Sequence, residues 1–208
     1  MKFYHANPSP KKYEIMCNIC EEIDNRAEYT PKSYVKKNWN YILDNGIYTD
    51  SFSPEAWKQF LIKVGEGIYR EPDFIVLPDK MNDPTRTFCR SQAYYNLPKD
   101  LGISYYYVIQ PTRDNYKTYI DHAKELKADG VFIGGNNKWS LLDIPEIMDL
   151  AHNNGLKVHI GKPKKLYQAY KVGADSIDSS SITRNRSYDR LRNLENKIRE
   201  QKELGEFT

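Results

Sequence analysis

The sequence lacks any run of about 18 apolar residues, which excludes a membrane-spanning helix. Its opening stretch, MKFYHANPSPKK, has none of the apolar core that a secretory signal peptide needs. Only three cysteines are present, an odd number that fits a reducing compartment better than a disulfide scaffold. These absences predict a cytoplasmic protein without contact with a membrane.

The sequence also lacks a large excess of charge of either sign. It has 31 Lys and Arg and 28 Asp and Glu, which give a net charge of +3. That balance excludes a polycationic coat for nucleic acids, so binding of this kind would need local basic patches. Cys17 and Cys20 form a CxxC pair, but no second CxxC or paired histidines complete the four ligands of a zinc site. We therefore predict no metal and no cofactor.

Short apolar runs are plentiful, and most of them are rich in β-branched or aromatic residues and stop at Gly, Pro or Asp, as buried strands do. Six or seven runs qualify. Between them lie stretches with helical spacing, most clearly Tyr116–Lys127, Ile144–Asn153 and Lys164–Val172. Alternation of strand and helix predicts a parallel sheet, and the period of about 25 residues suits a (β/α) barrel of the TIM type as well as an open sheet. We predict the barrel.

One strand is missing from this count, so either a further strand lies within residues 25–40 or the barrel is reduced or incomplete. At 208 residues with 39% hydrophobic content, the chain predicts a single barrel domain over 1–208. The end of the chain, Arg184–Phe207, alternates basic and acidic residues around three apolar positions. It predicts one charged, mostly solvated C-terminal helix over about 185–205.

Polar groups follow several of the predicted strands at the point where each strand ends. They are Asp44, Asp79, Gln110 and Asp178, and another strand ends in Gly134-Gly135. The carboxyl ends of parallel barrel strands open on one face, so these residues should converge. Each Asp by itself could instead cap the following helix.

Such a set of groups suits chemistry on a nucleoside. Paired carboxylates serve reactions at an anomeric carbon, where one acts as nucleophile and the other handles a proton. A third acid, an amide and free backbone N–H groups suit the donors and acceptors on the edge of a purine. Tyr48 follows Asp44 closely and could stack on a base.

The segment VHIGKPKKLYQAYKVGADSIDSSSITRN, residues 158–185, resembles the C-terminal barrel segment of the tRNA-guanine transglycosylases. Four further motifs fall in the order of that family: LDNGIYT (43–49), VLPD (76–79), YVIQ (107–110) and FIGG (132–135). The resemblance implies that Asp178 is the covalent nucleophile and Asp44 the general acid/base. It also implies a set of substrate-binding residues, namely Tyr48, Asp79, Gln110, Gly134, Gly135, Val158 and His159.

The chain departs from that family after Asn185, where no Cys and no His follow, whereas the tRNA enzymes carry a zinc subdomain there. It also has Asn45 and Ile47 in place of Ser and Gly in the first motif. In its compactness it is more similar to the zinc-free branch from phages and genomic islands, which inserts 7-deazaguanines into DNA. A viral protein of this kind would work in the host cytoplasm.

The expected partners are a nucleic acid, DNA in preference to tRNA, and a free 7-deazaguanine base. Basic residues that flank the proposed nucleophile are assigned to the phosphate backbone: Lys162, Lys164, Lys165, Arg184 and Arg186. Alternatives stay open: exchange on tRNA, a glycosylase that stops at hydrolysis, or a non-catalytic nucleic-acid-binding barrel. A homodimer or a partner subunit stays open too.

Overall fold

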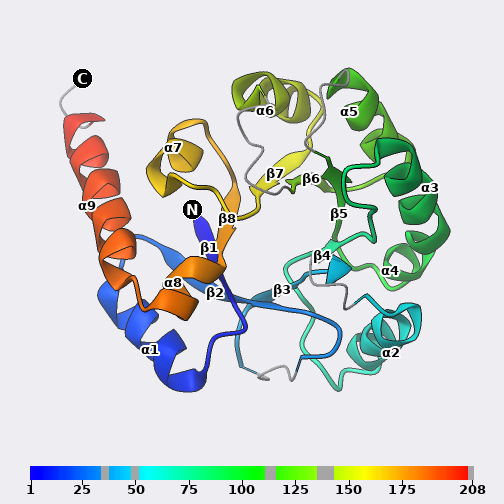
Figure 1. Cartoon of the computed structure of the whole chain (residues 1–208), viewed down its shortest axis with the longest axis horizontal. Helices are drawn as coiled ribbons and strands as arrows, with labels where there is room; N and C mark the ends of the chain where they lie inside the picture. Colours follow the sequence, from blue (N-terminus) through cyan, green and yellow to red (C-terminus); the bar gives the residue numbers. More distant parts are fainter. Residues whose placement is uncertain (34–37, 48–51, 111–115, 135–142, 206–208) are drawn as a thin grey trace.

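The computed structural model describes residues 1–33, 38–47, 52–110, 116–134 and 143–205. Within these ranges eight parallel strands close into one barrel in chain order, and β8 returns to pair with β1 (Figure 1). This confirms the predicted TIM-type barrel and shows that it is complete. The strands are β1 Lys2–Ala6, β2 Asp24–Tyr29, β3 Tyr41–Leu43, β4 Ile75–Val76, β5 Tyr105–Ile109, β6 Gly130–Ile133, β7 Lys157–Ile160 and β8 Ser176–Ser179.

Helices follow the strands and surround the barrel in Figure 1. The three helical stretches predicted from spacing are confirmed to within two residues at each end, as α5, α6 and α7. The helices are α1 Pro10–Ile19, α2 Pro54–Gly65, α3 Pro84–Tyr94, α4 Asn96–Asp100, α5 Tyr116–Glu125, α6 Ile144–Asn153, α7 Leu166–Lys171, α8 Ser180–Asn185 and α9 Tyr188–Gly205.

The strand missing from the sequence-based count is β2, which pairs with β1 and β3. Its sequence, DNRAEY, carries charged residues at alternate positions and has no apolar run. Side chains of a strand alternate between the two faces, and Ala27 and Tyr29 belong to the core outside the barrel. Arg26 and Glu28 therefore point into the barrel interior, which explains why this buried strand reads as polar.

The C-terminal helix predicted over about 185–205 is confirmed as α9, which begins at Tyr188. Arg186 adopts a left-handed conformation, with φ 52°, so the short α8 ends and a separate α9 begins at Tyr188. This helix is not only solvated, because Leu191, Leu194 and Ile198 are buried against the barrel. Lysines and arginines on its other positions account for the charged appearance of the sequence.

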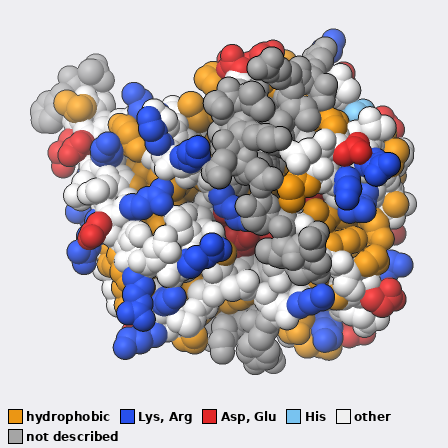
Figure 2. Space-filling model, viewed as in Figure 1, with side chains coloured by type: hydrophobic (Ala, Val, Ile, Leu, Met, Phe, Trp, Pro, Cys, Tyr) orange, Lys and Arg blue, Asp and Glu red, His pale blue; other side chains and the backbone are white. Residues whose placement is uncertain are grey.

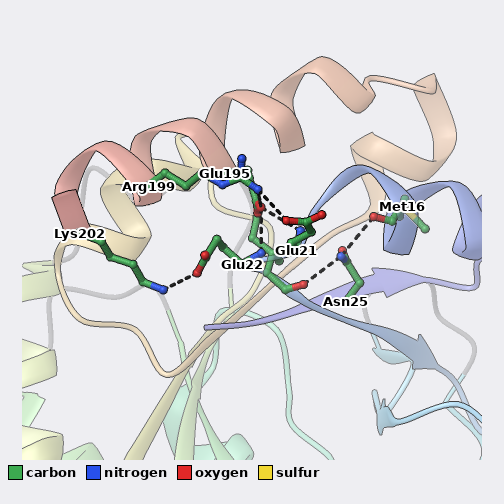
Figure 3. A network of polar contacts seen from close by, with 8 residues as sticks. Met16, Glu21, Glu22, Asn25, Glu195, Arg199 and Lys202 are labelled. Atoms are coloured by element: carbon green, nitrogen blue, oxygen red, sulfur yellow. Dashed lines mark hydrogen bonds and ion pairs between the residues drawn. The ribbon is translucent and has the colours of Figure 1, made fainter.

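A buried carboxylate fastens α9 beside α1 (Figure 3). Glu195 is 3% exposed, and its Oε1 accepts the backbone N–H groups of Glu21 and Glu22, each at 2.8 Å. Arg199 donates to Glu21 Oε2 at 3.1 Å, and Lys202 pairs with Glu22. These contacts satisfy backbone donors just after α1 and hold α9 beside that end of α1.

Two apolar cores lie on either side of the barrel wall. The larger core fills the space between strands and helices. The smaller core consists of inward-pointing side chains, and it fills the barrel with Tyr4, Ile42, Phe74, Val76, Tyr106 and Val108, with Phe132 packed against it. The filled interior leaves space for a ligand only above it. Among the described residues, no helix is long and apolar enough to cross a membrane.

Candidate active site

A cavity lies at the carboxyl ends of the strands, above the apolar filling of the barrel. Its lining combines acidic and amide groups with apolar side chains and two glycines: Glu28, Asp44, Asn45, Ile47, Val76, Asp79, Met81, Asn82, Val108, Gln110, Phe132, Gly134, Gly161, Lys162 and Asp178. Six residues proposed from the sequence are thus brought together: Asp44, Asp79, Gln110, Gly134, Lys162 and Asp178. Tyr48 and Gly135 lie outside the described residues.

Asp178 is held from two sides at the end of β8, where it is 1% exposed. The backbone N–H of Lys162 donates to its Oδ1 at 3.2 Å, and His159 Nε2 lies 3.1 Å from its Oδ2. The Ser176 hydroxyl, 2.8 Å from His159 Nδ1, can donate to that nitrogen and so leave the imidazole N–H facing Asp178. Both oxygens of Asp178 then face N–H donors, which fix the orientation of the carboxyl group.

The turn after β7 is shaped to reach Asp178. Lys162 has a left-handed backbone, with φ 51°, which aims its N–H at the carboxylate. At Gly161 an added Cβ would lie 2.8 Å from the Phe132 ring and 3.2 Å from Asp178 Oδ2. A larger residue there would push against both groups, so glycine keeps the space beside the carboxylate open.

Asp44, at the end of β3, has its pKa raised to about 6. Burial is the main cause, and the negative charges of Asp178 and Asp79 add to it. The Lys162 cation and the Gly46 backbone N–H act in the opposite direction. A carboxyl whose pKa lies near neutrality can both give and take a proton, which a general acid/base requires.

Asp79 follows β4 and lies in a buried network of side-chain amides. Asn45 Nδ2 donates to Asp79 Oδ1 at 2.8 Å, and Gln110 Nε2 donates to Asp79 Oδ2 at 2.5 Å. The oxygens of these two amides accept backbone N–H groups: Asn45 Oδ1 accepts that of Ile47 and Gln110 Oε1 that of Asn82, each at 2.9 Å. The backbone N–H of Asp79 also donates to this carboxylate. A carboxylate has about four acceptor positions, so one remains for a ligand. The sequence reading treated Asn45 only as a departure from the family motif and missed this role.

Glu28 is the acidic residue of the cavity that was not predicted from the sequence. It lies at the end of β2, is 6% exposed, and its Oε2 is buried without a hydrogen-bond partner. Burial raises the pKa of its carboxyl well above the ordinary value, and the charges of Asp178 and Asp44 raise it further. The alternation of charge in DNRAEY was the one available signal that β2 carries inward-facing polar groups.

Two predicted base-binding residues are placed elsewhere. Val158 belongs to the core between the strands and the helices, so its side chain points away from the cavity. His159 is fully buried beneath the cavity, stacks on Phe132 at a centroid distance of 4.7 Å and contacts Asp178. Neither side chain is therefore among the described residues that line the cavity. His159 positions Asp178 instead.

The basic residues assigned to phosphates divide into two groups. Lys162 lines the cavity, whereas Lys164, Lys165, Arg184 and Arg186 are exposed. Figure 2 shows acidic side chains at the centre of this face and Lys and Arg side chains on several sides of it, the region of α7, α8 and α9 included.

Comparisons with known proteins identify the fold. No protein-family model matches the chain, and no curated protein matches its sequence. Among solved structures, similar chains come from the tryptophan synthase α2β2 complex of Pyrococcus furiosus (TM-score 0.53, 95% of each chain) and from Yersinia pestis RipC (TM-score 0.53, 93% of this chain and 94% of that one). A third is the tryptophan synthase α subunit of Legionella pneumophila (TM-score 0.54, 94% and 92%). Identity is 12% in each case, which shows the shared barrel alone.

Proposed function

We propose that this chain is a base-exchange transglycosylase that replaces guanine with a 7-deazaguanine in a nucleic acid, DNA in preference to tRNA. One observation carries the proposal: two carboxyls in different environments share one cavity. Asp178 lies within hydrogen-bond distance of His159 Nε2 and of the Lys162 backbone N–H, while burial brings the pKa of Asp44 to about 6. Separating the roles of two carboxyls by their environments is how enzymes assign nucleophile and acid.

In the first half of the reaction, an oxygen of Asp178 attacks C1′ of the target nucleotide. The bond from C1′ to the guanine nitrogen breaks, its electron pair goes to the base, and Asp44 delivers the proton that the base takes. In the second half, Asp44 accepts the proton of the incoming 7-deazaguanine, whose nitrogen attacks C1′ and releases Asp178. No proton is gained or lost over the exchange, and neither half needs a redox partner.

Recognition of the base is assigned to the amide network and the apolar walls. Asp79 would accept from the N–H donors on the guanine edge, with Gln110 beside it. Val76, Val108 and Phe132 line the same cavity and offer the flat surfaces of the base an apolar contact. Because the anomeric carbon is inaccessible in a stacked duplex, the target nucleotide must be turned out into the cavity.

Uptake of labelled guanine tests the proposal directly. The protein is incubated with labelled guanine and either duplex DNA or tRNA, and label in each polymer is counted. We expect uptake into DNA, a covalent protein–polymer adduct on denaturing gels, and loss of both with Asp178→Asn, because a carboxamide is a poor nucleophile.

Asp175→Asn is the matched control. Asp175 lies three residues earlier, is not among the described residues of the cavity lining, accepts the Val158 N–H at 2.7 Å and contacts His152. It should retain exchange. Uptake into tRNA alone would move the substrate to tRNA, and release of guanine without uptake would indicate a hydrolytic glycosylase. Full uptake by Asp178→Asn would refute the covalent mechanism, and binding of polymer with neither uptake nor release would indicate a non-catalytic barrel.

A further inference from the structure

Three acidic side chains of the cavity lie near one cation. Glu28 interacts electrostatically with Asp178, Asp44 and Lys162, and Asp44 interacts with Asp178 and Lys162. Lys162 is the one Lys or Arg among the described residues of the lining. Burying three carboxylates beside a single cation is strongly unfavourable, so the group retains a proton at neutral pH.

Hydrogen bonding indicates which carboxyl keeps that proton. Asp178 has donors at both oxygens, and Asp44 has the Gly46 N–H. Glu28 has no side-chain hydrogen bond to any described residue, and its buried Oε2 has no partner. A buried carboxyl without donors is the poorest place for a negative charge, so the proton resides on Glu28.

The strand register places Glu28 within reach of the other two groups. Glu28 lies opposite Ile42 of β3, and Asp44 lies two residues further along that strand, on the same interior side. On its other side Glu28 lies opposite Ala6 of β1, which has no polar side chain, and β8 with Asp178 is the next strand. Glu28 thus stands between the proposed nucleophile and the proposed acid.

We propose that Glu28 is the proton reservoir of this site: it holds the proton that the departing base takes, and Asp44 passes that proton on. The inference rests on the proposed base exchange and deepens it. In the free enzyme the proton resides on Glu28 and not on Asp44. As the base leaves, the Asp44 carboxylate receives the Glu28 proton and delivers it to the base. Asp178 has then become a neutral ester and Glu28 a carboxylate.

The number of negative charges beside Lys162 is two before this step and two after it. Formation of the ester removes the charge of Asp178, which is one of the charges that keep Glu28 protonated. Release of the proton from Glu28 is therefore favoured at the moment when the base needs it. The second half of the exchange returns the proton from the incoming base to Glu28 through Asp44.

The experiment compares wild type with Glu28→Gln, which keeps the shape and neutrality of the protonated residue but has no proton to give. Guanine exchange is measured from about pH 5 to pH 9 on the polymer that wild type modifies. In the variant, Asp44 is the remaining acid, with a pKa of about 6. Its protonated fraction falls tenfold per pH unit, so the variant should lose about 100-fold in rate at pH 8 relative to wild type and little at pH 5.

The groups that face Glu28 from neighbouring elements stay the same in this comparison: Asp178 on β8, Asp44 on β3 and Lys162 after β7. Affinity for free guanine, measured by calorimetry, should stay unchanged. Glu195→Gln is the matched control, because Glu195 is also a buried glutamate with an unpartnered Oε2 but lies in α9, outside the barrel. It should keep the pH profile of wild type.

Each other outcome overturns the inference, and the outcomes identify which proposal has failed. A Glu28→Gln rate equal to wild type at all pH values, with exchange intact, overturns the role of Glu28 alone. A rate lowered by the same factor at every pH, or with loss of guanine affinity, shows a structural role and overturns it too. Absence of exchange by wild type overturns the proposed function and this inference together.

Discussion

Replacing Asp44 with Asn should stabilise the protein while removing its activity. Burial raises the pKa of this carboxyl from its ordinary 3.8 to about 6. The folded state therefore binds its proton more tightly than the unfolded chain does, and the contribution of Asp44 to stability falls as pH rises from about 4 through about 6. Above that range Asp44 is ionised in both states, and folding moves its negative charge from water into the protein, which costs free energy.

At about 1.4 kcal/mol per pH unit, the rise from 3.8 to about 6 costs about 3 kcal/mol of folding free energy at pH 8. An asparagine keeps the size of Asp44 and still accepts the Gly46 N–H, but it needs no ionisation. For a chain of this length, 3 kcal/mol corresponds to a rise of roughly 6–12 °C in the melting temperature. The gain should vanish near pH 4, where Asp44 is protonated in the folded protein.

Urea unfolding of wild type and Asp44→Asn at about pH 8 and about pH 4 measures the effect. Asp175→Asn serves as the control, because that side chain is 41% exposed and its carboxylate already accepts N–H groups. It should not stabilise the protein at either pH. Destabilisation by Asp44→Asn at pH 8, or a gain of the same size at both pH values, would refute the buried, costly charge that the catalytic assignment requires.

Two further predictions concern recognition. Asp79→Ala should weaken binding of free guanine by roughly 10- to 150-fold, the value of a buried hydrogen bond to a charged acceptor, and calorimetry with unchanged affinity would remove Asp79 from the base pocket. Four or five phosphate contacts from Lys162, Lys164, Lys165, Arg184 and Arg186 should give duplex DNA binding a log–log salt slope near −4. Charge reversal at exposed Lys165 and Arg184 should flatten that slope by about 2 and leave guanine affinity unchanged, so an unaltered slope would exclude these side chains from the phosphate backbone.

Much of the barrel could be predicted because its strands and helices carry local signals. Ile144–Asn153 shows the spacing of an amphipathic helix and forms α6 with those bounds. Runs such as Tyr105–Ile109 are apolar on both faces, as strands inside a covered parallel sheet must be. The strand β2 had no such signal, because its inward positions hold Arg26 and Glu28 instead of apolar residues.

The same distinction applies to the candidate site. Asp44, Asp79, Gln110 and Asp178 could be expected to converge from the sequence alone, because the carboxyl ends of parallel strands open on one face whatever the details of packing. The partners of these groups could not be predicted in the same way. Nothing local in the sequence indicates that His159 lies under Asp178 or that Asn45 holds Asp79, since those contacts depend on how neighbouring strands are staggered around the barrel.

The sequence by itself therefore determined the alternation of strands and helices, the barrel class and the strand ends that carry polar groups, because each of these depends on local periodicity and on a rule shared by all parallel barrels. Only the tertiary structure decided the surroundings of those groups. Closing β2 between β1 and β3 buries Glu28 Oε2 without a donor among the described residues and places Glu28 near Asp44, Asp178 and Lys162. Burial and the approach of like charges set the pKa of a carboxyl, and both arise from residues far apart in the chain.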